Sequence, residues 1–140
     1  MPTPPQGVRY AIISPVKDEE LYIEATLRSV ANQTWKPSQW VIVDDGSSDR
    51  TPEILGAYAN QVPWIQVLQI QRGPERQLGS AEIRAFSKGL EQVRIESIDF
   101  MVKLDCDVEL PPDYFARLLV KFQEDDNLGI ASGVYLENQK

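Results

Sequence analysis

The stretch Trp40-Val41-Ile42-Val43-Asp44-Asp45-Gly46-Ser47-Ser48-Asp49 decides the fold of this chain, because a fully apolar run passes directly into a polar turn. A short apolar run bounded by turn residues is typical of a strand buried on both faces. Thr51-Pro52 then resembles a helix N-cap followed by proline at the first helical position, and the apolar face of that helix comprises Ile54, Leu55, Tyr58 and Ala59. The stretch therefore predicts a strand, a tight turn and a helix in succession.

Strand-like and helix-like patterns alternate on both sides of this unit. We expect strands at 10–13, 65–70, 100–104 and 129–134, in addition to 40–43. The other helices are expected to begin at the acidic cluster 18–20, after the polar segment 71–79, and at Pro111-Pro112. The residues expected on their buried faces are Ile23, Leu27, Val30 and Ala31; Ile83, Phe86, Leu90 and Val93; and Phe115, Leu118, Leu119 and Phe122. This order predicts an α/β fold with a mostly parallel sheet, helices on both faces and right-handed crossovers.

The composition excludes several functional classes. The chain has 14 basic and 21 acidic residues and a net charge of −7, which argues against electrostatic binding of nucleic acid and against a polybasic membrane anchor. One cysteine and no histidine exclude an internal disulfide, a multi-cysteine zinc site and catalysis by Ser–His or Cys–His pairs. The acidic surplus instead favours a hard divalent cation bound through oxygen.

A length of 140 residues suits a single domain, which we expect to span 10–140 after a flexible lead at 1–9. The lead lacks the apolar core of a signal peptide, and no apolar run approaches the roughly eighteen residues that a membrane span requires. Together with the free Cys106, these features favour a cytoplasmic location.

Three polar clusters directly follow expected strands: Ser14-Pro15, Asp44-Asp45-Gly46 and Asp105-Cys106-Asp107. In open parallel sheets, ligands bind at the carboxyl ends of the strands. We therefore expect the three clusters to open onto one edge of the sheet, where their side chains form a common site.

Asp105 and Asp107 are the strongest candidates for a cation site. Alternation along an extended segment places both carboxylates on one side, where they repel each other unless a cation lies beside them. Mg²⁺ or Mn²⁺ meets this need and keeps coordination positions free for phosphates. The alternative is a solvated turn before the helix expected at Pro111-Pro112. Cys106 lies between two aspartates, which raise the pKa of its thiol, so we do not interpret it as a nucleophile.

Two further segments supply candidates for ligand contacts. Turn chemistry and helix capping account for residues 46–51, but they do not account for two successive carboxylates in Asp44-Asp45. One of these must point into the crevice, toward a base imide or a ribose hydroxyl. Arg72, Arg76 and Arg84 lie before or in the next helix and could approach a diphosphate, although basic residues in loops are more often simply solvated.

Four motifs occur in a characteristic order: Ile12-Ile13-Ser14-Pro15-Val16-Lys17-Asp18-Glu19, Gln33-Thr34-Trp35, Val41-Ile42-Val43-Asp44-Asp45-Gly46-Ser47-Ser48-Asp49 and Lys103-Leu104-Asp105-Cys106-Asp107. In this order and spacing the chain resembles the family 2 glycosyltransferases, which have the GT-A fold. The likeness runs from about Tyr10 to Tyr135. It implies a nucleotide-sugar donor, with a UDP-sugar favoured, a divalent cation, and transfer to an acceptor hydroxyl with inversion at the anomeric carbon.

By position, the resemblance implies that Pro15 and Glu19 line the nucleotide pocket and that Asp45 contacts the base. It places Asp105 near the ribose or the metal, and Asp107 on the metal that bridges the diphosphate. Two departures concern the donor pocket. Val16-Lys17-Asp18 stands where the family more often has Thr-Tyr-Asn, and residues 85–89 lack the arginine and asparagine of the family's Ala-Arg-Asn-x-Gly stretch. Arg84 precedes that stretch and is retained as a candidate for donor binding.

The general base of the family follows well after the Asp-x-Asp motif, whereas only residues 108–140 follow it here, so we expect the base outside this segment. The chain is then the donor-binding part of a longer enzyme, or alternatively a non-catalytic nucleotide-binding remnant of the same fold. A remoter alternative is a haloacid-dehalogenase-type phosphatase with Asp105 as nucleophile and Asp107 as acid, but that motif belongs after a first strand. The acceptor, a saccharide, a lipid or a protein, stays open, and a lipid would bring the enzyme to the cytoplasmic face of a membrane.

Overall fold

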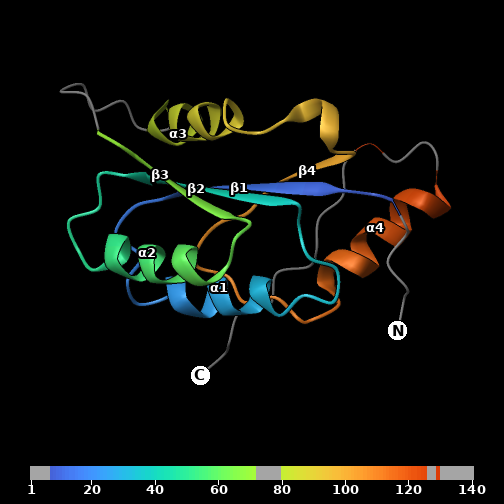
Figure 1. The fold of residues 1–140 in the computed structure, drawn as a ribbon, viewed down its shortest axis with the longest axis horizontal. Coiled ribbons are helices and arrows are strands. Elements are labelled where there is room, and N and C mark those ends of the chain that lie inside the picture. The colour runs from blue at the N-terminus through green and yellow to red at the C-terminus, as the bar shows by residue number, and fades with distance from the viewer. Residues whose placement is uncertain (1–6, 72–79, 126–128, 130–140) are drawn as a thin grey trace.

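A parallel sheet of four strands forms the centre of the computed structural model, which describes residues 7–71, 80–125 and 129 (Figure 1). In chain order the strands are β1 (Tyr10–Val16), β2 (Gln39–Asp45), β3 (Ile65–Ile70) and β4 (Phe100–Lys103), and their order in the sheet is β3-β2-β1-β4. All three strand pairings are parallel, which confirms the predicted α/β class. The strand expected at 129–134 lies outside the described residues, apart from Gly129.

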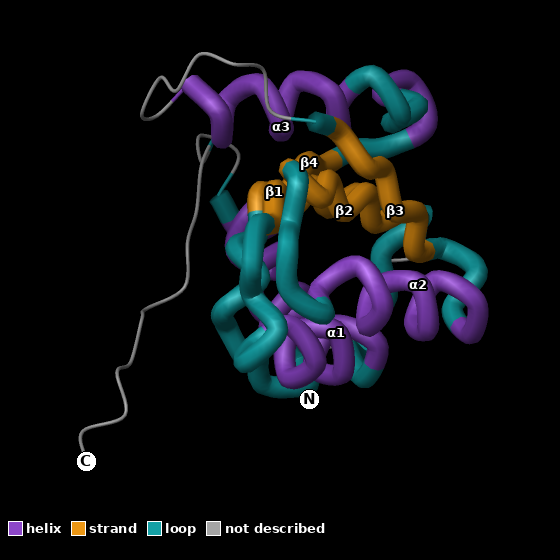
Figure 2. Tube along the Cα trace, turned by 90° about the vertical axis from the view of Figure 1, so that its left-hand side faces the viewer, coloured by secondary structure: helices purple, strands orange, loops and turns teal. Residues whose placement is uncertain are grey.

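The helices cover both faces of this sheet, as the sequence predicted. One face carries α1 (Ile23–Ala31), α2 (Thr51–Gln61) and α4 (Tyr114–Glu124). The other face carries α3 (Ser80–Leu90), which is followed by the short 3-10 turn η1 (Ile95–Ser97) (Figures 1 and 2). Among the described residues, no helix combines the length and the apolar character needed to cross a membrane.

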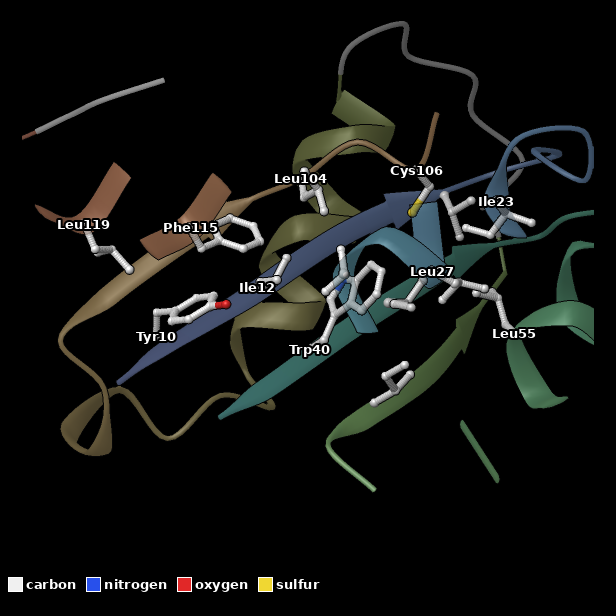
Figure 3. Close-up of a cluster of buried hydrophobic side chains, with 14 residues drawn as sticks. Tyr10, Ile12, Ile23, Leu27, Trp40, Leu55, Leu104, Cys106, Phe115 and Leu119 are labelled. Carbon is white, nitrogen blue, oxygen red and sulfur yellow. The ribbon is translucent and has the colours of Figure 1, made fainter. Parts of the chain in front are cut away.

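The larger core lies between the sheet and the helices α1, α2 and α4 (Figure 3). Trp40, Tyr10 and Phe115 are its largest fully buried side chains. The ring centroids of Tyr10 and Phe115 are 5.0 Å apart. The Tyr10 hydroxyl donates to the carbonyl oxygen of Trp35, and Trp40 Nε1 donates to Ser14 Oγ at 2.9 Å. Both polar aromatic side chains therefore keep a hydrogen bond where water is excluded, so their burial leaves no donor unpaired.

The smaller core lies between the sheet and α3. Its buried members are Ala11, Ile13, Val41, Val43, Ala85 and Val93, with Phe86 and Leu90 packed against them. The helix approaches most closely at Gly89, where an added Cβ would lie 2.7 Å from Ile13 Cγ2 and 2.9 Å from Val43 Cγ2. The prediction that Ile83 belongs to the buried face is wrong, because Ile83 is 69% exposed. The small residues Ala85 and Gly89 occupy the side of α3 that meets the sheet.

The first strand is longer than the sequence predicted. Ser14-Pro15 was expected to end it, but β1 continues through both residues, and Pro15 lies opposite Val43 of β2. The Leu104 N–H donates to the Ile13 carbonyl oxygen at 3.1 Å, so the backbone polar groups of alternate β1 residues, which include Pro15, face β4. Because β4 ends at Lys103, the missing N–H of Pro15 removes no hydrogen bond from the β1–β4 ladder.

Three helix starts also differ from the prediction. α1 begins at Ile23, and the acidic cluster 18–20 lies in the turn before it, where Asp18 has a left-handed φ of 52° and the N–H groups of the cluster bond to side chains of the segment 47–51. α2 begins at Thr51 itself, with no side-chain hydrogen bond at its N-cap. α4 begins at Tyr114, and Pro111-Pro112 form the turn before it.

Replacing Gly89 with alanine should destabilise the fold. The new methyl group would enter the contact between α3 and the sheet, and overpacking of this kind costs about 1–3 kcal/mol, against a gain of about 1 kcal/mol in helix propensity. Gly56 of α2 is the matched control, because no atom lies within 4 Å of its added Cβ. Chemical denaturation should show a lower free energy of unfolding for Gly89→Ala and an unchanged or higher one for Gly56→Ala. Equal effects of the two substitutions would contradict the close helix–sheet contact.

Candidate functional site

The polar ends of β1, β2 and β4 meet at the carboxyl edge of the sheet. The parallel register places Val16 beside Asp44 and Asp45 beside Ile70, while Ile13 pairs with Lys103 at the end of β4. The turns that follow these three strands therefore leave the sheet at one edge. This topology confirms the predicted convergence for the turns at Asp44-Asp45-Gly46 and Asp105-Cys106-Asp107, whereas Ser14-Pro15 lie within β1 and do not follow it.

Asp44 and Asp45 are the last two residues of β2, and both are nearly buried, with 2% and 5% exposure. Asp44 Oδ1 accepts a hydrogen bond from the Ser47 N–H at 3.1 Å, so this carboxylate holds the turn in which Gly46 adopts a φ of 72°. Alternation along the strand places Asp45 on the side of Val43, which is the side that α3 covers. The pair therefore divides into one carboxylate that braces the turn and one that projects toward the other face.

The Asp105-Cys106-Asp107 turn alternates between solvent and core. Asp105 and Asp107 are exposed, whereas Cys106 is 3% exposed and belongs to the larger core, near Ser14 (Figure 3). Burial raises the pKa of the Cys106 thiol to about 12; a hydrogen bond with Ser14 opposes this, and the charges of the neighbouring carboxylates add to it. The predicted rise is confirmed, with burial rather than the aspartates as its main cause. The thiol stays protonated, and both aspartates are exposed to solvent.

Lys103 joins the start of α3 to the Asp105 turn. Its Nζ lies 2.6 Å from Glu82 Oε1 and 3.3 Å from Asp105 Oδ1, and the hydrogen bond to Glu82 is the first cause of a raised Lys103 pKa. Our sequence reasoning missed this contact. The signal was present, because Lys103 and Asp105 are two residues apart on an extended segment and so project to the same side.

The pKa of Glu19 reflects its burial and the negative charge of neighbouring carboxylates at this edge of the sheet. Its pKa is raised first by burial and then by the charges of Asp107, Asp49 and Asp105. Three carboxylates from two different turns thus act on a fourth, although the two turns and Glu19 lie far apart in the sequence. A cation beside Asp105 and Asp107 would reverse the sign of the local field.

The carboxylate oxygens available at this edge fit a cation that takes few ligands from the protein. In the ranges that the structure describes, no group of three or more histidine, cysteine or acidic side chains is arranged to hold a metal by itself. Mg²⁺ is usually held by one or two carboxylates, with phosphates and water completing its shell. Two exposed aspartates therefore suit a cation that arrives with a diphosphate, and Asp105 already shares a contact with Lys103.

Gln33 fixes the turn that follows Asp107. This side chain is 1% exposed, and its Nε2 donates to the carbonyl oxygens of Ser29 at 3.1 Å and Pro111 at 2.7 Å. Its Oε1 accepts the Phe115 N–H at 3.1 Å. The motif Gln33-Thr34-Trp35 contributed to the family resemblance but did not predict these hydrogen bonds. The only sequence signal for them was an amide at the end of an apolar helix face. The amide ties the start of α4 to the end of α1.

The remaining candidates are placed less closely together. Pro15 is half-buried within β1. Arg84 is exposed on α3, two residues after Glu82, and so projects from a different side of the helix than the Glu82–Lys103 contact. No contact that the structure describes joins Arg84 to Asp105 or Asp107. Arg72 and Arg76 lie outside the described residues.

Sequence comparison places the chain among known proteins. A sequence model of "Glycosyl transferase family 2" matches residues 11–140. The chain is 29% identical over 120 residues to "Uncharacterized glycosyltransferase YkcC" and 30% identical over 122 residues to "Putative glycosyltransferase EpsH", both of Bacillus subtilis. These alignments cover 84% and 87% of this chain but 34% and 33% of the relatives. The chain therefore spans about a third of the length of the curated relatives that it matches.

Solved structures share the fold. TarS of S. aureus, residues 1–349, has a TM-score of 0.66 at 24% identity, and the match covers 84% of this chain and 33% of that one. Mannosyltransferase PcManGT from Pyrobaculum calidifontis, in complex with GDP-Man and Mn²⁺, has a TM-score of 0.64 at 24% identity, covering 86% and 34%. These matches identify the fold as GT-A, as the sequence resemblance implied.

Replacing Glu19 with glutamine should stabilise the protein in the absence of ligand, and more so as pH rises. The folded-state pKa of Glu19 is raised, so its ionisation costs stability: the protonated carboxyl is favourable below its unfolded pKa of about 4.3, and this advantage is lost as pH rises through the folded pKa. Thermal unfolding should give a higher Tm for Glu19→Gln at pH 7, with a smaller difference at pH 4. The exposed Glu24, paired with Arg28 at 3.9 Å, is the control, and Glu24→Gln should give no such gain. A Tm gain that does not vary with pH would contradict the electrostatic cause.

Proposed function

We propose that this chain, which belongs to glycosyl transferase family 2, binds the diphosphate of a nucleotide-sugar through Asp105, Asp107 and a divalent cation, and serves the transfer of the sugar to an acceptor hydroxyl. The proposal rests above all on one observation: two exposed carboxylates follow β4 at the sheet edge where Glu19 also lies. Burial is the first cause of the raised Glu19 pKa, and the charges of these two carboxylates raise it further. A cation at this position would remove their repulsion and attract the diphosphate.

Each candidate side chain at the carboxyl edge of the sheet has its own role in donor binding. Asp107 is the principal metal ligand, because Asp105 is shared with Lys103. Asp105 reaches the metal or the ribose of the donor. Asp45 accepts a hydrogen bond from the base, and Glu19 lines the nucleotide pocket. Pro15, in the same segment as Glu19, would contact the nucleotide, and Arg84 would approach the diphosphate.

The reaction would be a direct displacement. The bond from the acceptor oxygen to the anomeric carbon forms as the bond from that carbon to the phosphate oxygen breaks, which inverts the configuration, and a general base takes the proton of the hydroxyl. Bound Mg²⁺ or Mn²⁺ supplies charge neutralisation for the departing nucleoside diphosphate. We assign the general base to none of the described residues. Their task is to orient the donor, and the chain spans about a third of the length of the curated relatives that it matches.

Ligands of structural neighbours support this donor class. TarS structures contain UDP and UDP-GlcNAc, and PcManGT contains GDP-Man and Mn²⁺. We favour a UDP-sugar. Similar proteins include a "Poly-beta-1,6-N-acetyl-D-glucosamine synthase" of Staphylococcus aureus and an "Undecaprenyl-phosphate 4-deoxy-4-formamido-L-arabinose transferase" of Pectobacterium carotovorum, so saccharide and lipid acceptors both stay open, as does protein. We place the protein in the cytoplasm, where Cys106 stays reduced, or peripherally at the cytoplasmic face of a membrane.

The proposal predicts metal-dependent nucleotide binding that requires Asp107. Calorimetric titration with UDP, GDP, CDP and TDP, each with and without Mn²⁺, should detect binding of one nucleotide, UDP by our expectation, only when Mn²⁺ is present. Asp107→Asn should weaken this binding by at least the roughly 10- to 100-fold that accompanies loss of even an outer-shell partner of a metal. Glu24→Gln, a charge change on the exposed surface of α1, should leave the affinity unchanged.

Two outcomes would count against the proposal. Absence of binding by any of the four nucleotides to folded protein would refute the donor site. Binding that needs no metal and survives Asp107→Asn would refute the role of the cation. Metal-dependent binding without transfer by this chain alone is the result expected of the donor-binding part as well as of the non-catalytic alternative, because the general base is assigned to neither.

A further inference from the structure

The turn after β1 is held by side chains of the turn after β2. Three successive backbone N–H groups of the first turn donate to it: Asp18 N to Ser47 Oγ at 2.9 Å, Glu19 N to Thr51 Oγ1 at 2.9 Å, and Glu20 N to Asp49 Oδ2 at 3.1 Å. Each bond spans about thirty residues of sequence. These contacts satisfy three backbone donors in a turn where Asp18 has a left-handed φ of 52°.

The same two turns are bonded in the opposite direction. The Ser48 N–H donates to Asp18 Oδ1 at 2.7 Å, and the Arg50 N–H donates to Glu20 Oε2 at 3.1 Å. We call these five reciprocal hydrogen bonds between segments 18–20 and 47–51 the loop clasp. Its two halves constrain each other, because each turn supplies both backbone donors and side-chain acceptors.

The loop clasp connects to the carboxylates of the candidate site at two points. Ser47, which accepts from Asp18, donates its own N–H to Asp44 Oδ1 at 3.1 Å. Glu19 stands between the two clasped residues Asp18 and Glu20, and its pKa responds to the charges of Asp105 and Asp107. The Glu19 backbone is therefore held by contacts with the segment 47–51, and not by Asp105 or Asp107 themselves.

We infer that Asp18 is a positioning residue for the donor site: by accepting the Ser48 N–H it holds Glu19 in place for the nucleotide, without contacting the ligand itself. This inference rests on the proposed nucleotide site. Asp18 suits the task for two reasons. Its φ of 52° lies in the left-handed region, which aspartate, asparagine and glycine tolerate better than other residues, and its short side chain reaches back to the neighbouring turn.

Substitutions at Asp18 separate the hydrogen bond from the backbone conformation and from the charge. Asp18→Gly keeps the left-handed conformation and loses the acceptor; Asp18→Asn keeps both; and Asp18→Ala loses the acceptor and strains the backbone. The affinity for UDP with Mn²⁺ is measured by calorimetry, below the unfolding temperature of every variant. We expect Asp18→Gly and Asp18→Ala to weaken binding equally, by about tenfold, because a displaced contact group loses its geometry with the ligand. Asp18→Ala should nevertheless show a lower Tm than Asp18→Gly.

Asp18→Asn should bind UDP as tightly as the unchanged chain, since its amide oxygen accepts the same N–H. Equal losses in Asp18→Gly and Asp18→Asn would overturn the inference, because charge would then be the cause. Unchanged affinity in Asp18→Gly would overturn it as well.

A second pair of substitutions, both at Glu20, tests the hydrogen bond that the Arg50 N–H donates in the loop clasp. Glu20→Ala removes the exposed acceptor of the Arg50 N–H and should weaken binding by about threefold, whereas Glu20→Gln keeps an acceptor and should not. No effect of Glu20→Ala would contradict mutual constraint by the two turns. Failure of the unchanged chain to bind UDP or any other nucleotide with Mn²⁺ would refute the proposed function and this inference together, whereas normal binding by Asp18→Gly would refute the positioning role alone.

Discussion

The parallel pairing of β1 with β2 on one side and β4 on the other is the interaction on which the site depends. Parallel pairing directs the carboxyl ends of all three strands to one edge, so residues from turns far apart in the sequence meet there. Helices on both sides of the sheet also bury β1 on both faces. Tyr10 and Ile12 face the larger core, and Ala11 and Ile13 face the smaller one. The apolar strands thus provide a rigid base for polar side chains just beyond their ends.

The edge gathers negative charge that the fold does not neutralise. Lys103 contacts Asp105, but it is shared with Glu82. The pKa of Glu19, which burial raises first, is raised further by the charges of Asp107, Asp49 and Asp105. Arrangements that cost stability without ligand are characteristic of binding sites, where a bound group restores the balance. The hydrogen bonds of Gln33 and of the loop clasp offset this cost, because they hold the turns in place although their carboxylates repel.

The sequence predicts the order of elements and the convergence of the acidic turns, because both follow from local patterns: apolar runs mark the strands, and parallel topology brings their ends together. It fails where distant contacts override local preference. The cluster 18–20 looks like a helix start, yet its N–H groups bond to a turn about thirty residues away. Ile83 looks like a core residue, yet close packing selects Ala85 and Gly89 instead. The role of Gln33 could not be predicted, since two of its three partners, Pro111 and Phe115, are about eighty residues away in the sequence.

The charge of this edge has a further consequence for how a donor would bind. A nucleoside diphosphate is an anion, and the edge presents Glu19, Asp105 and Asp107 to it. Binding without a cation would therefore add repulsion between the diphosphate and these carboxylates to the repulsion among the carboxylates themselves. A cation alone would gain two carboxylates but lack most of its oxygen ligands. The cation supplies the positive charge that the diphosphate needs at this edge, and the diphosphate supplies the oxygen ligands that the cation needs. Each should therefore raise the affinity of the protein for the other by the same factor, as linkage requires. The acidic surplus of the chain is thus compatible with binding an anion, provided that the anion and the cation are bound at the same time.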